Sequence, residues 1–508
     1  MLTTILRQLS QYTPLHDWFI GLSSRNVAPV LVALALGLGL LLRCTMRKAS
    51  QNAWGLPLPP GPPHMPLVGN LFQMPQVDPW IVYNDWAKKY STNTFSEHIS
   101  SRDITYLEVL GQRIVILNSV KSITNILEKK AVNTSERLWM PVFDLLKLDW
   151  SFPFMNYTLF WKAHRKHFHQ HLGPMQMEIY RPIIEDQTIK YLRALVKNPH
   201  DFCLQTRSWL GLTFMRLSYG INDAQWNENL IVKAQAVHQG FSEAAIAGHY
   251  LVNSIPLLRH VPAWVPGAGW RKRLEAAGEL SREVSRVPFK QAKEQVTHPS
   301  YEERATIARN VAAIGYIAGA DTTLSALYGL IIALAMHPEV MAKAQNEMDT
   351  SIGTDRLPQP EDYERLLFVQ AVVKESTRWH TVGPFALLHV SKKDEHSCRI
   401  LERFPDPMSF KPERYFKGGK HNKELLDPEF GIFGYGRQMC PGRLLAKDII
   451  LAHFAMCMIS LFNIKPGRDE HGKEIPLEYK VASEVICTPA PYQVEVRPRS
   501  ANDAALIG

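Results

Sequence analysis

The longest regular pattern in this chain is a helical one with a very high apolar content. From Ala305 to Met336 the residues follow a helical period and are apolar on nearly every face. The pattern stops at His337-Pro338, because proline and the residue before it disfavour a continuing helix. At ~1.5 Å per residue, such a helix is roughly 50 Å long. A helix without a polar face has to be buried, so we expect it to cross the centre of one large domain.

The remaining sequence predicts that this domain is mostly helical. From Pro66 onward there is no second linker, repeat or low-complexity segment, so residues 66–508 are expected to fold together. Two more apolar helices are predicted, over Tyr363–Trp379 and from Leu444 to about Ser460. Two early β-like runs around a glycine predict a hairpin: Thr105–Val109, Gly111 and Ile114–Leu117. The expected fold class is mainly α with small β-sheets.

A separate apolar stretch near the N-terminus predicts a membrane anchor. Val27–Leu42 has no charged residue, and an extension to Met46 reaches the ~20 residues that a spanning helix needs. Basic residues follow it, which favours the cytosol for the rest of the chain. We therefore expect a lumenal segment 1–26, a transmembrane helix 27–46 and a basic, proline-rich linker 47–65. A cleaved signal peptide is the alternative, but no small-residue cleavage site follows the apolar run.

Charge and cysteine content narrow the possible partners. The 57 Lys and Arg outnumber the 48 Asp and Glu, and this net charge of +9 suits an acidic protein surface or anionic lipid headgroups. No long basic run is interleaved with aromatic residues, so nucleic acid is not an expected partner. None of the six cysteines forms a C-x-x-C pair, and their density is too low for a disulfide scaffold.

One cysteine, Cys440, has neighbours that set it apart. It lies in the segment Phe433-Gly434-Tyr435-Gly436-Arg437-Gln438-Met439-Cys440-Pro441-Gly442. The glycines permit tight backbone paths and the close approach of a flat ligand. We expect an apolar helix just after the cysteine, and a helix N-terminus favours a thiolate.

The pattern F-x-x-G-R-x-x-C-x-G in this segment resembles the cysteine signature of the cytochrome P450 family. The resemblance implies a heme b (iron protoporphyrin IX) cofactor whose iron takes Cys440 as its axial ligand. It also implies that Phe433, Gly436, Arg437 and Gly442 bind this cofactor. Further motifs follow the family order over essentially the whole body of the chain.

The first of these motifs is E-x-x-R, formed by Glu375 and Arg378. Spacing of i, i+3 on a helix places both side chains on one face, where they can pair. Together with Arg414 in the later segment Lys411-Pro412-Glu413-Arg414, they resemble the Glu–Arg–Arg triad of the family. The resemblance implies a buried charge network with a structural role.

The second motif, Ala318-Gly319-Ala320-Asp321-Thr322-Thr323, interrupts the long apolar helix with polar groups. It resembles the oxygen-activation motif of the family, which implies that Asp321 and Thr322 are catalytic. Thr322 would hydrogen-bond the bound oxygen or a water, Asp321 would help to relay protons, and Gly319 would leave room for O2. The residues alone also allow a helix kink satisfied by local hydrogen bonds to the backbone.

The third motif is W-x-x-x-R, formed by Trp161 and Arg165, which in the family meets a heme propionate. His389 is a further candidate for a propionate contact. The helix of Trp161 also carries histidines, three of which share a face, so a zinc site is conceivable. No nearby cysteine or carboxylate completes it, and a basic surface that could dock an acidic reductase is the preferred interpretation: His164, His167, His169 and His171.

Two features depart from the family pattern. Gln438 occupies the position where an Arg or His usually holds a propionate, and it supplies no charge. Only 36 positions separate Arg378 from Arg414, where the family has an added strand pair. The chain therefore lacks roughly 15–20 residues near 394–400, about one hairpin. A misread exon boundary and a damaged protein are both possible explanations.

The resemblance implies a fungal-type microsomal P450 monooxygenase, an oxidoreductase of class EC 1.14. It would insert one oxygen atom from O2 into a lipophilic secondary metabolite or xenobiotic. Electrons would come from NADPH through an NADPH–cytochrome reductase, with cytochrome b5 as an optional second donor. The protein would lie in the endoplasmic reticulum membrane as a single-pass protein, with a cytosolic catalytic domain. Residues expected to face the substrate are Ile314, Tyr316, Ala318 and 382–388.

Two alternatives stay open at this point. The internal deletion would also fit a catalytically impaired heme-binding relic. A heme-thiolate isomerase or dehydratase that uses no external electrons is the other alternative. It is disfavoured because the Asp321-Thr322 pair, which such variants often lose, is present.

Overall fold

The computed structural model describes residues 58–66, 68–75, 77–90, 104–245, 249–294, 302–391, 406–481 and 485–508. The expected transmembrane helix 27–46, most of the expected linker 47–65 and the segment near 394–400 lie outside these residues. Within the described part, one helix is long and apolar enough to span a membrane, but 61% of its most apolar stretch is buried inside the domain.

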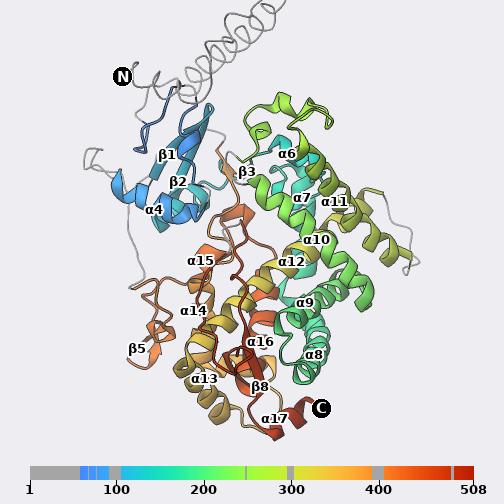
Figure 1. Ribbon diagram of the computed structural model, residues 1–508, viewed down its shortest axis with the longest axis vertical. Helices are drawn as coiled ribbons and strands as arrows, with labels where there is room; N and C mark the ends of the chain where they lie inside the picture. The colour runs from blue at the N-terminus through green and yellow to red at the C-terminus, as the bar shows by residue number, and fades with distance from the viewer. Residues whose placement is uncertain are drawn as a thin grey trace, which may run out of the picture.

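That helix, α12 (Glu302–Met336), runs through the middle of the domain (Figure 1). It begins slightly before the predicted start and ends at the predicted residue. Four of its side chains, spaced i, i+3, i+4 and i+7, are completely inaccessible to solvent: Leu327, Leu330, Ile331 and Leu334. The expectation of a core helix is confirmed.

Other helices surround α12 on several sides, and those that pack directly on it include α7 (Leu159–Leu172), α9 (Phe202–Tyr219), α11 (Gly269–Glu294) and α14 (Leu367–Trp379). In Figure 1, α8, α9 and α10 lie on one side of α12, and α13 and α14 lie on the other. The remaining helices are α4 (Pro79–Lys89), α5 (Val120–Ile123), α6 (Pro141–Leu145), α8 (Pro174–Lys197), α10 (Ala224–Ala245), α13 (Pro338–Ser351), α15 (Glu429–Ile432), α16 (Ala452–Leu461) and α17 (Ala501–Ile507).

The predicted bounds of two helices were wrong in detail. The helix expected over Tyr363–Trp379 is split into the 3-10 turn η6 (Pro360–Arg365) and α14. Asp362 accepts from the backbone N–H of Gln359 at 2.8 Å and binds Arg356, which closes the turn before the helix starts. The helix expected from Leu444 begins as a π-helical turn, η9 (Leu445–Leu451), and becomes α-helical only in α16.

The remaining short helical turns are mostly 3-10 turns that connect longer elements: η1 (Leu71–Gln73), the π-helical η2 (Thr124–Glu128), η3 (Phe152–Phe154), η4 (Leu251–Asn253), η5 (Pro256–His260), η7 (Pro412–Tyr415) and η8 (Gly436–Gln438). The last of these carries part of the cysteine segment, so its geometry shapes the candidate site.

The strands of the described residues form four two-stranded antiparallel sheets. The predicted hairpin is present as β1 (Ile104–Val109) and β2 (Gln112–Leu117), and Gly111 in its turn has φ of +81°, which a residue with a side chain rarely adopts. The hairpin and α4 lie at the opposite end of the domain from α17 (Figure 1). The other pairs are β3 (Glu136–Arg137) with β4 (His389–Val390), β5 (Phe416–Lys417) with β6 (Lys420–His421), and β7 (Phe462–Pro466) with β8 (Val494–Pro498).

Candidate active site

The segment before Cys440 folds back on itself. The backbone N–H of Cys440 donates to the carbonyl of Phe433 at 2.7 Å, which closes a tight loop. Gly434 and Gly436 have φ of +74° and +56°, values that favour glycine. A Cβ on Gly436 would also lie 2.4 Å from the carbonyl oxygen of Leu127. Glycine at position 436 is therefore required both by the backbone and by the approach of η2.

The surroundings of the Cys440 sulfur do not favour a thiolate by themselves. Burial raises the pKa of the Cys440 thiol above its ordinary value, and the backbone N–H of Gly442 and the charges of Arg165 and Arg443 oppose this only in part. The expectation that a helix N-terminus would favour the thiolate is met only in part. Helical backbone begins at Arg443, and the Gly442 N–H just before it lowers the pKa of the thiol, but burial raises that pKa by more. A positively charged metal is what would stabilise the thiolate here.

Helix α7 carries Trp161 and Arg165 to the cysteine loop. Thr158 caps the helix by accepting from the backbone N–H of Trp161 at 3.3 Å. Arg165 donates from Nη1 to the carbonyl oxygen of Met439, next to the cysteine. The indole Nε1 of Trp161 is buried and has no hydrogen-bond partner in the described part of the chain.

The β3–β4 pair brings a second set of polar groups to the same region. His389 has its Nδ1 2.7 Å from the carbonyl oxygen of Thr134, and burial, helped by Arg137, lowers its pKa to about 4. It is therefore neutral at pH 7. Arg137 donates from Nη1 to the carbonyl of Leu387 at 2.7 Å, while its Nε is buried without a partner among the described residues. Sequence analysis missed Arg137, because it belongs to no spaced motif.

Gln438, the uncharged substitute noted in the sequence, is used in a local contact. Its Nε2 donates to the carbonyl of Ser135 at 2.8 Å, which ties the cysteine loop to the residue just before β3. Arg437 stacks its guanidinium over the ring of Tyr157 at 4.8 Å. Arg137, a buried cation, follows Ser135 by two residues in the sequence.

These donors fit a heme. A buried N–H without a partner is costly in a folded protein, and such groups are rare. Trp161 Nε1 and Arg137 Nε are two of them, and both suit the carboxylate of a propionate. Cys440 supplies the soft sulfur that an iron ligand requires. The residues present therefore match the cofactor that the cysteine segment implies.

Helix α12 presents its polar motif differently from the sequence expectation. Thr322 Oγ1 donates to the carbonyl of Ala318 at 2.6 Å. This is the local hydrogen bond to the backbone that the sequence left open as an alternative. Ala318 itself is exposed to solvent, halfway along the core helix. Asp321 Oδ2 lies 3.0 Å from Nδ1 of His238 on α10, a partner that no sequence pattern indicated.

Two further residues of α12 contact neighbouring helices. A Cβ on Gly319 would lie 2.3 Å from the ring of Phe214, so this glycine makes room for α9, and its role in leaving room for O2 stays a prediction. The ring of Tyr316 is buried in the main core, and its hydroxyl lies 3.4 Å from the side-chain amide of Asn227. Ile314 is also buried, in the aromatic cluster around Trp161.

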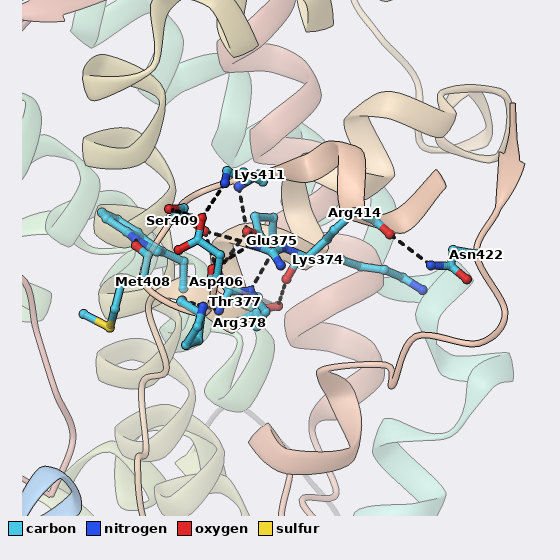
Figure 2. Close-up of polar contacts among 12 residues, drawn as sticks. Lys374, Glu375, Thr377, Arg378, Asp406, Met408, Ser409, Lys411, Arg414 and Asn422 are labelled. Carbon is cyan, nitrogen blue, oxygen red and sulfur yellow. Dashed lines mark hydrogen bonds and ion pairs between the residues drawn. The ribbon is translucent and has the colours of Figure 1, made fainter. Parts of the chain in front are cut away.

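The structure brings Glu375, Arg378 and Arg414 together (Figure 2). The Glu375 side chain is completely buried, and its two oxygens lie 2.8 Å from Arg378 Nε and 3.0 Å from Arg414 Nε. The backbone N–H of Lys411 also donates to Glu375, at 2.7 Å. Both arginines donate to the carbonyl of Ser409 at 3.0 Å. The network thus fixes the 406–414 segment on α14.

The histidines of α7 do not form a metal site. His164 is fully buried, with Nδ1 2.8 Å from the carbonyl of Phe160 and Nε2 3.1 Å from Asn310 on α12. His167 and His171 stack on one another at 6.0 Å. No group of three potential metal ligands occurs in the described ranges.

A family model gives the decisive comparison. The model of cytochrome P450 matches residues 59–221, 290–397 and 399–496. The chain belongs to the cytochrome P450 family. Most of this P450 is therefore matched, and within the matched range residues 222–289 and residue 398 are left out.

Curated relatives agree with this assignment. The P450 is 40% identical to cytochrome P450 monooxygenase COX1 of Coprinopsis cinerea, over 95% of this chain and 99% of the relative. It is 33% identical to COX2 of the same fungus, over 88% and 90%. It is 30% identical to tryptamine 4-monooxygenase of Psilocybe cyanescens, over 87% and 93%. The P450 is thus a fungal-type monooxygenase, and its family implies a heme cofactor.

The alignment with COX1 also bears on the internal deletion. It extends over 526 positions, more than the 508 residues of this P450. The relative therefore has residues without a counterpart here. The break in the family match at residue 398 lies within the stretch where the sequence appeared short.

Proposed function

We propose that this P450 inserts one oxygen atom from O2 into a lipophilic small molecule, with electrons from NADPH that arrive through a membrane reductase. The observation that carries the proposal is the glycine-shaped loop that holds Cys440, together with two buried donors without partners among the described residues, Trp161 Nε1 and Arg137 Nε. The overall reaction consumes O2, two electrons and two protons, and releases the hydroxylated product and one water.

One group of residues would hold the cofactor, and a second group would transfer protons. The bound heme would supply oxygen activation at its iron. Cys440 would ligate the iron, while Phe433, Gly436, Arg437 and Gly442 shape its loop. Trp161, Arg165, Arg137 and His389 would bind the propionates. Thr322 would turn from its backbone partner to donate at the oxygen site, with Asp321 as its proton source.

The spectrum of the reduced, CO-bound protein tests the proposal. The full chain in detergent should give a thiolate-type Soret band, and Cys440→Ala should lose it. Cys457→Ala is the matched control, because Cys457 is a buried cysteine of α16 outside the loop. A well-folded wild-type sample without the thiolate band would overturn the proposal.

We further propose an apolar or aromatic substrate and a membrane location. Phe385, Ala386 and Leu388, in the segment after α14, are partly or fully exposed and apolar. One relative is named for tryptamine, an aromatic amine. The apolar stretch 27–46 supports a single-pass anchor in the endoplasmic reticulum. A screen of aromatic compounds for heme spectral shifts tests the substrate class, and glycosylation-site tagging on either side of residues 27–46 tests the topology.

A second candidate function is a catalytically impaired heme binder. The break at residue 398 and the longer COX1 alignment favour it, because a missing hairpin would remove part of a sheet. This candidate predicts heme uptake without product, or no heme at all. Product formation from any substrate in the screen would exclude it.

A further inference from the structure

Asp321 is a carboxylate halfway along the mostly apolar core helix α12. Leaving such a group buried without a partner costs several kcal/mol, about 2–7 for a polar group and more for a charge. Its Oδ2 lies 3.0 Å from His238 Nδ1, and only 22% and 16% of the two side chains are exposed. The pair therefore links α12 to α10 inside the domain, with α9 alongside (Figure 1).

The second nitrogen of His238 distinguishes this contact from a simple structural pair. His238 Nε2 is buried and has no hydrogen-bond partner among the described residues. An imidazole can take up a proton at one nitrogen and release one at the other, which neither Lys nor Arg can do. A buried ring with one nitrogen on a carboxylate and the other available is suited to passing protons.

A small cavity is lined in part by Asp321. Its volume is about 20 Å³, and it is lined by Asp321, Arg207 and Tyr316 among mostly apolar residues. A cavity of roughly 10–15 Å³ or more holds one water when polar partners are present. The charged and titratable groups that face Asp321 are thus Arg207 from α9, His238 from α10 and Tyr316 from α12 itself.

We propose that His238 is the positioning residue of the acid–alcohol pair: it holds Asp321 and resupplies the proton that Asp321 passes on during oxygen activation. The inference rests on the proposed function. In the transfer, Nε2 takes up a proton from water, the Nδ1–H bond of the resulting imidazolium breaks, and an O–H bond forms at Asp321 Oδ2. The imidazolium and carboxylate charges both disappear, and the neutral ring returns to its Nδ1–H tautomer before the next turnover.

The variant His238→Gln tests this role. A glutamine amide can still donate to Asp321, but it cannot transfer a proton at neutral pH. With a P450 reductase, NADPH, O2 and 7-ethoxycoumarin as probe, we expect kcat to fall about 10–100-fold with little change in KM, in line with the loss of a proton-transfer group. The solvent deuterium isotope effect should change, and more peroxide should be released per NADPH.

Turnover driven by hydrogen peroxide separates proton supply from structural damage. Peroxide brings its own two protons and two electrons, so that reaction takes up no net proton from water. His238→Gln should therefore stay within about 3-fold of the wild type with peroxide while it loses the NADPH-driven activity. Gln239→Ala, the exposed neighbour on α10, is the control and should match the wild type in both assays.

A readout without activity tests the contact itself. A double-mutant cycle of His238→Gln and Asp321→Asn on the melting temperature should give coupled, non-additive shifts in the holoenzyme. Additive shifts would overturn the inference, as would equal losses with NADPH and with peroxide. Failure of the proposed function is recognised separately, by a wild type without the thiolate Soret band, and in that case the cycle still tests the pairing.

Discussion

Glu375 has no exposure to solvent, yet its carboxylate faces two guanidinium groups. Each of these charges would be costly to bury alone. Their pairing with one another, and the hydrogen bonds that they make with surrounding backbone groups, offset that cost. Removing one partner leaves the others buried and uncompensated. The triad thus acts as a cooperative unit, in contrast to the exposed ion pairs elsewhere on the domain.

We expect Glu375→Ala to lower the free energy of unfolding by about 3–5 kcal/mol, because Arg378 and Arg414 stay buried without their anion. Unfolding of the full chain in urea, followed by tryptophan fluorescence, measures this. The control is Glu413→Ala: Glu413 pairs with Lys343 at 2.8 Å, but both side chains are more than half exposed. Its loss should cost less than about 1 kcal/mol. A cost for Glu375→Ala as small as that of the control would contradict the buried-network account.

At the scale of elements, the close packing of α12 depends on where its glycines lie. Gly329 faces the ring of His380, which would be 2.4 Å from an added Cβ. His380 is held on both sides, 2.8 Å from Ser325 Oγ and 2.9 Å from the Tyr479 hydroxyl, so its ring has little freedom to move. Helix α12 and the residue after α14 are therefore fitted together at this glycine.

The variant Gly329→Ala should destabilise the protein by about 1–3 kcal/mol through this overpacking. Gly315→Ala on the same helix is the matched control. Its Cβ would meet only Ser218 Oγ, at 3.3 Å, so the roughly 1 kcal/mol gain in helix propensity should dominate. Thermal unfolding of both variants checks the prediction. Equal effects from the two substitutions would show that the His380 contact does not limit packing.

Helix α16 contains a histidine that burial keeps neutral. The pKa of His453 is lowered to about 4 by burial, from an ordinary value near 6.5. Between these values the unfolded chain binds a proton that the folded chain does not, so stability falls as pH drops from about 6.5 to about 4. The contribution of this one group to the loss is about 3 kcal/mol over the full range.

His453→Leu should therefore flatten the decline of melting temperature between pH 6.5 and pH 4.5. It also removes a buried Nδ1 that has no partner among the described residues, so stability at pH 7 should not fall. The control, His471→Leu, removes a histidine from an exposed turn and should keep the wild-type decline. If both variants decline like the wild type, the acid sensitivity arises elsewhere.

At the scale of the whole molecule, the proposed function depends on whether the cofactor region tolerates the internal deletion. The two-residue pairing of β3 with β4 carries Arg137 and His389, and the chain leaves the described structure just after it, at residue 391. A short, two-stranded pair is weakly stable by itself. An added strand pair would stabilise this small sheet.

We expect that inserting the COX1 residues that face the break at 398 raises the heme content of the purified protein. The ratio of Soret to protein absorbance measures this, and insertion of a Gly/Ser stretch of equal length is the control. The pairing of strands, and not the added length, should be responsible. A wild type that is already fully loaded with heme, and is not improved by the insertion, would show that the deletion is tolerated.

Local sequence patterns determined the features that depend on neighbouring residues alone. These are the extent of α12, the β1–β2 hairpin, the glycine loop before Cys440 and the i, i+3 pairing of Glu375 with Arg378, all of which follow from backbone preferences and helical spacing. Family resemblance added Arg414 as the third member of the triad.

Only the tertiary structure decided which distant groups meet. His238 reaches Asp321 from 83 residues away, Gly319 receives the ring of Phe214, and Arg137 lies unpaired at Nε beside the loop. No periodicity encodes these contacts, because they depend on how α9, α10 and β3 are placed against α12 and the cysteine loop. Burial, which also set the direction of the Cys440 pKa, is a property of the packed molecule and not of any one segment.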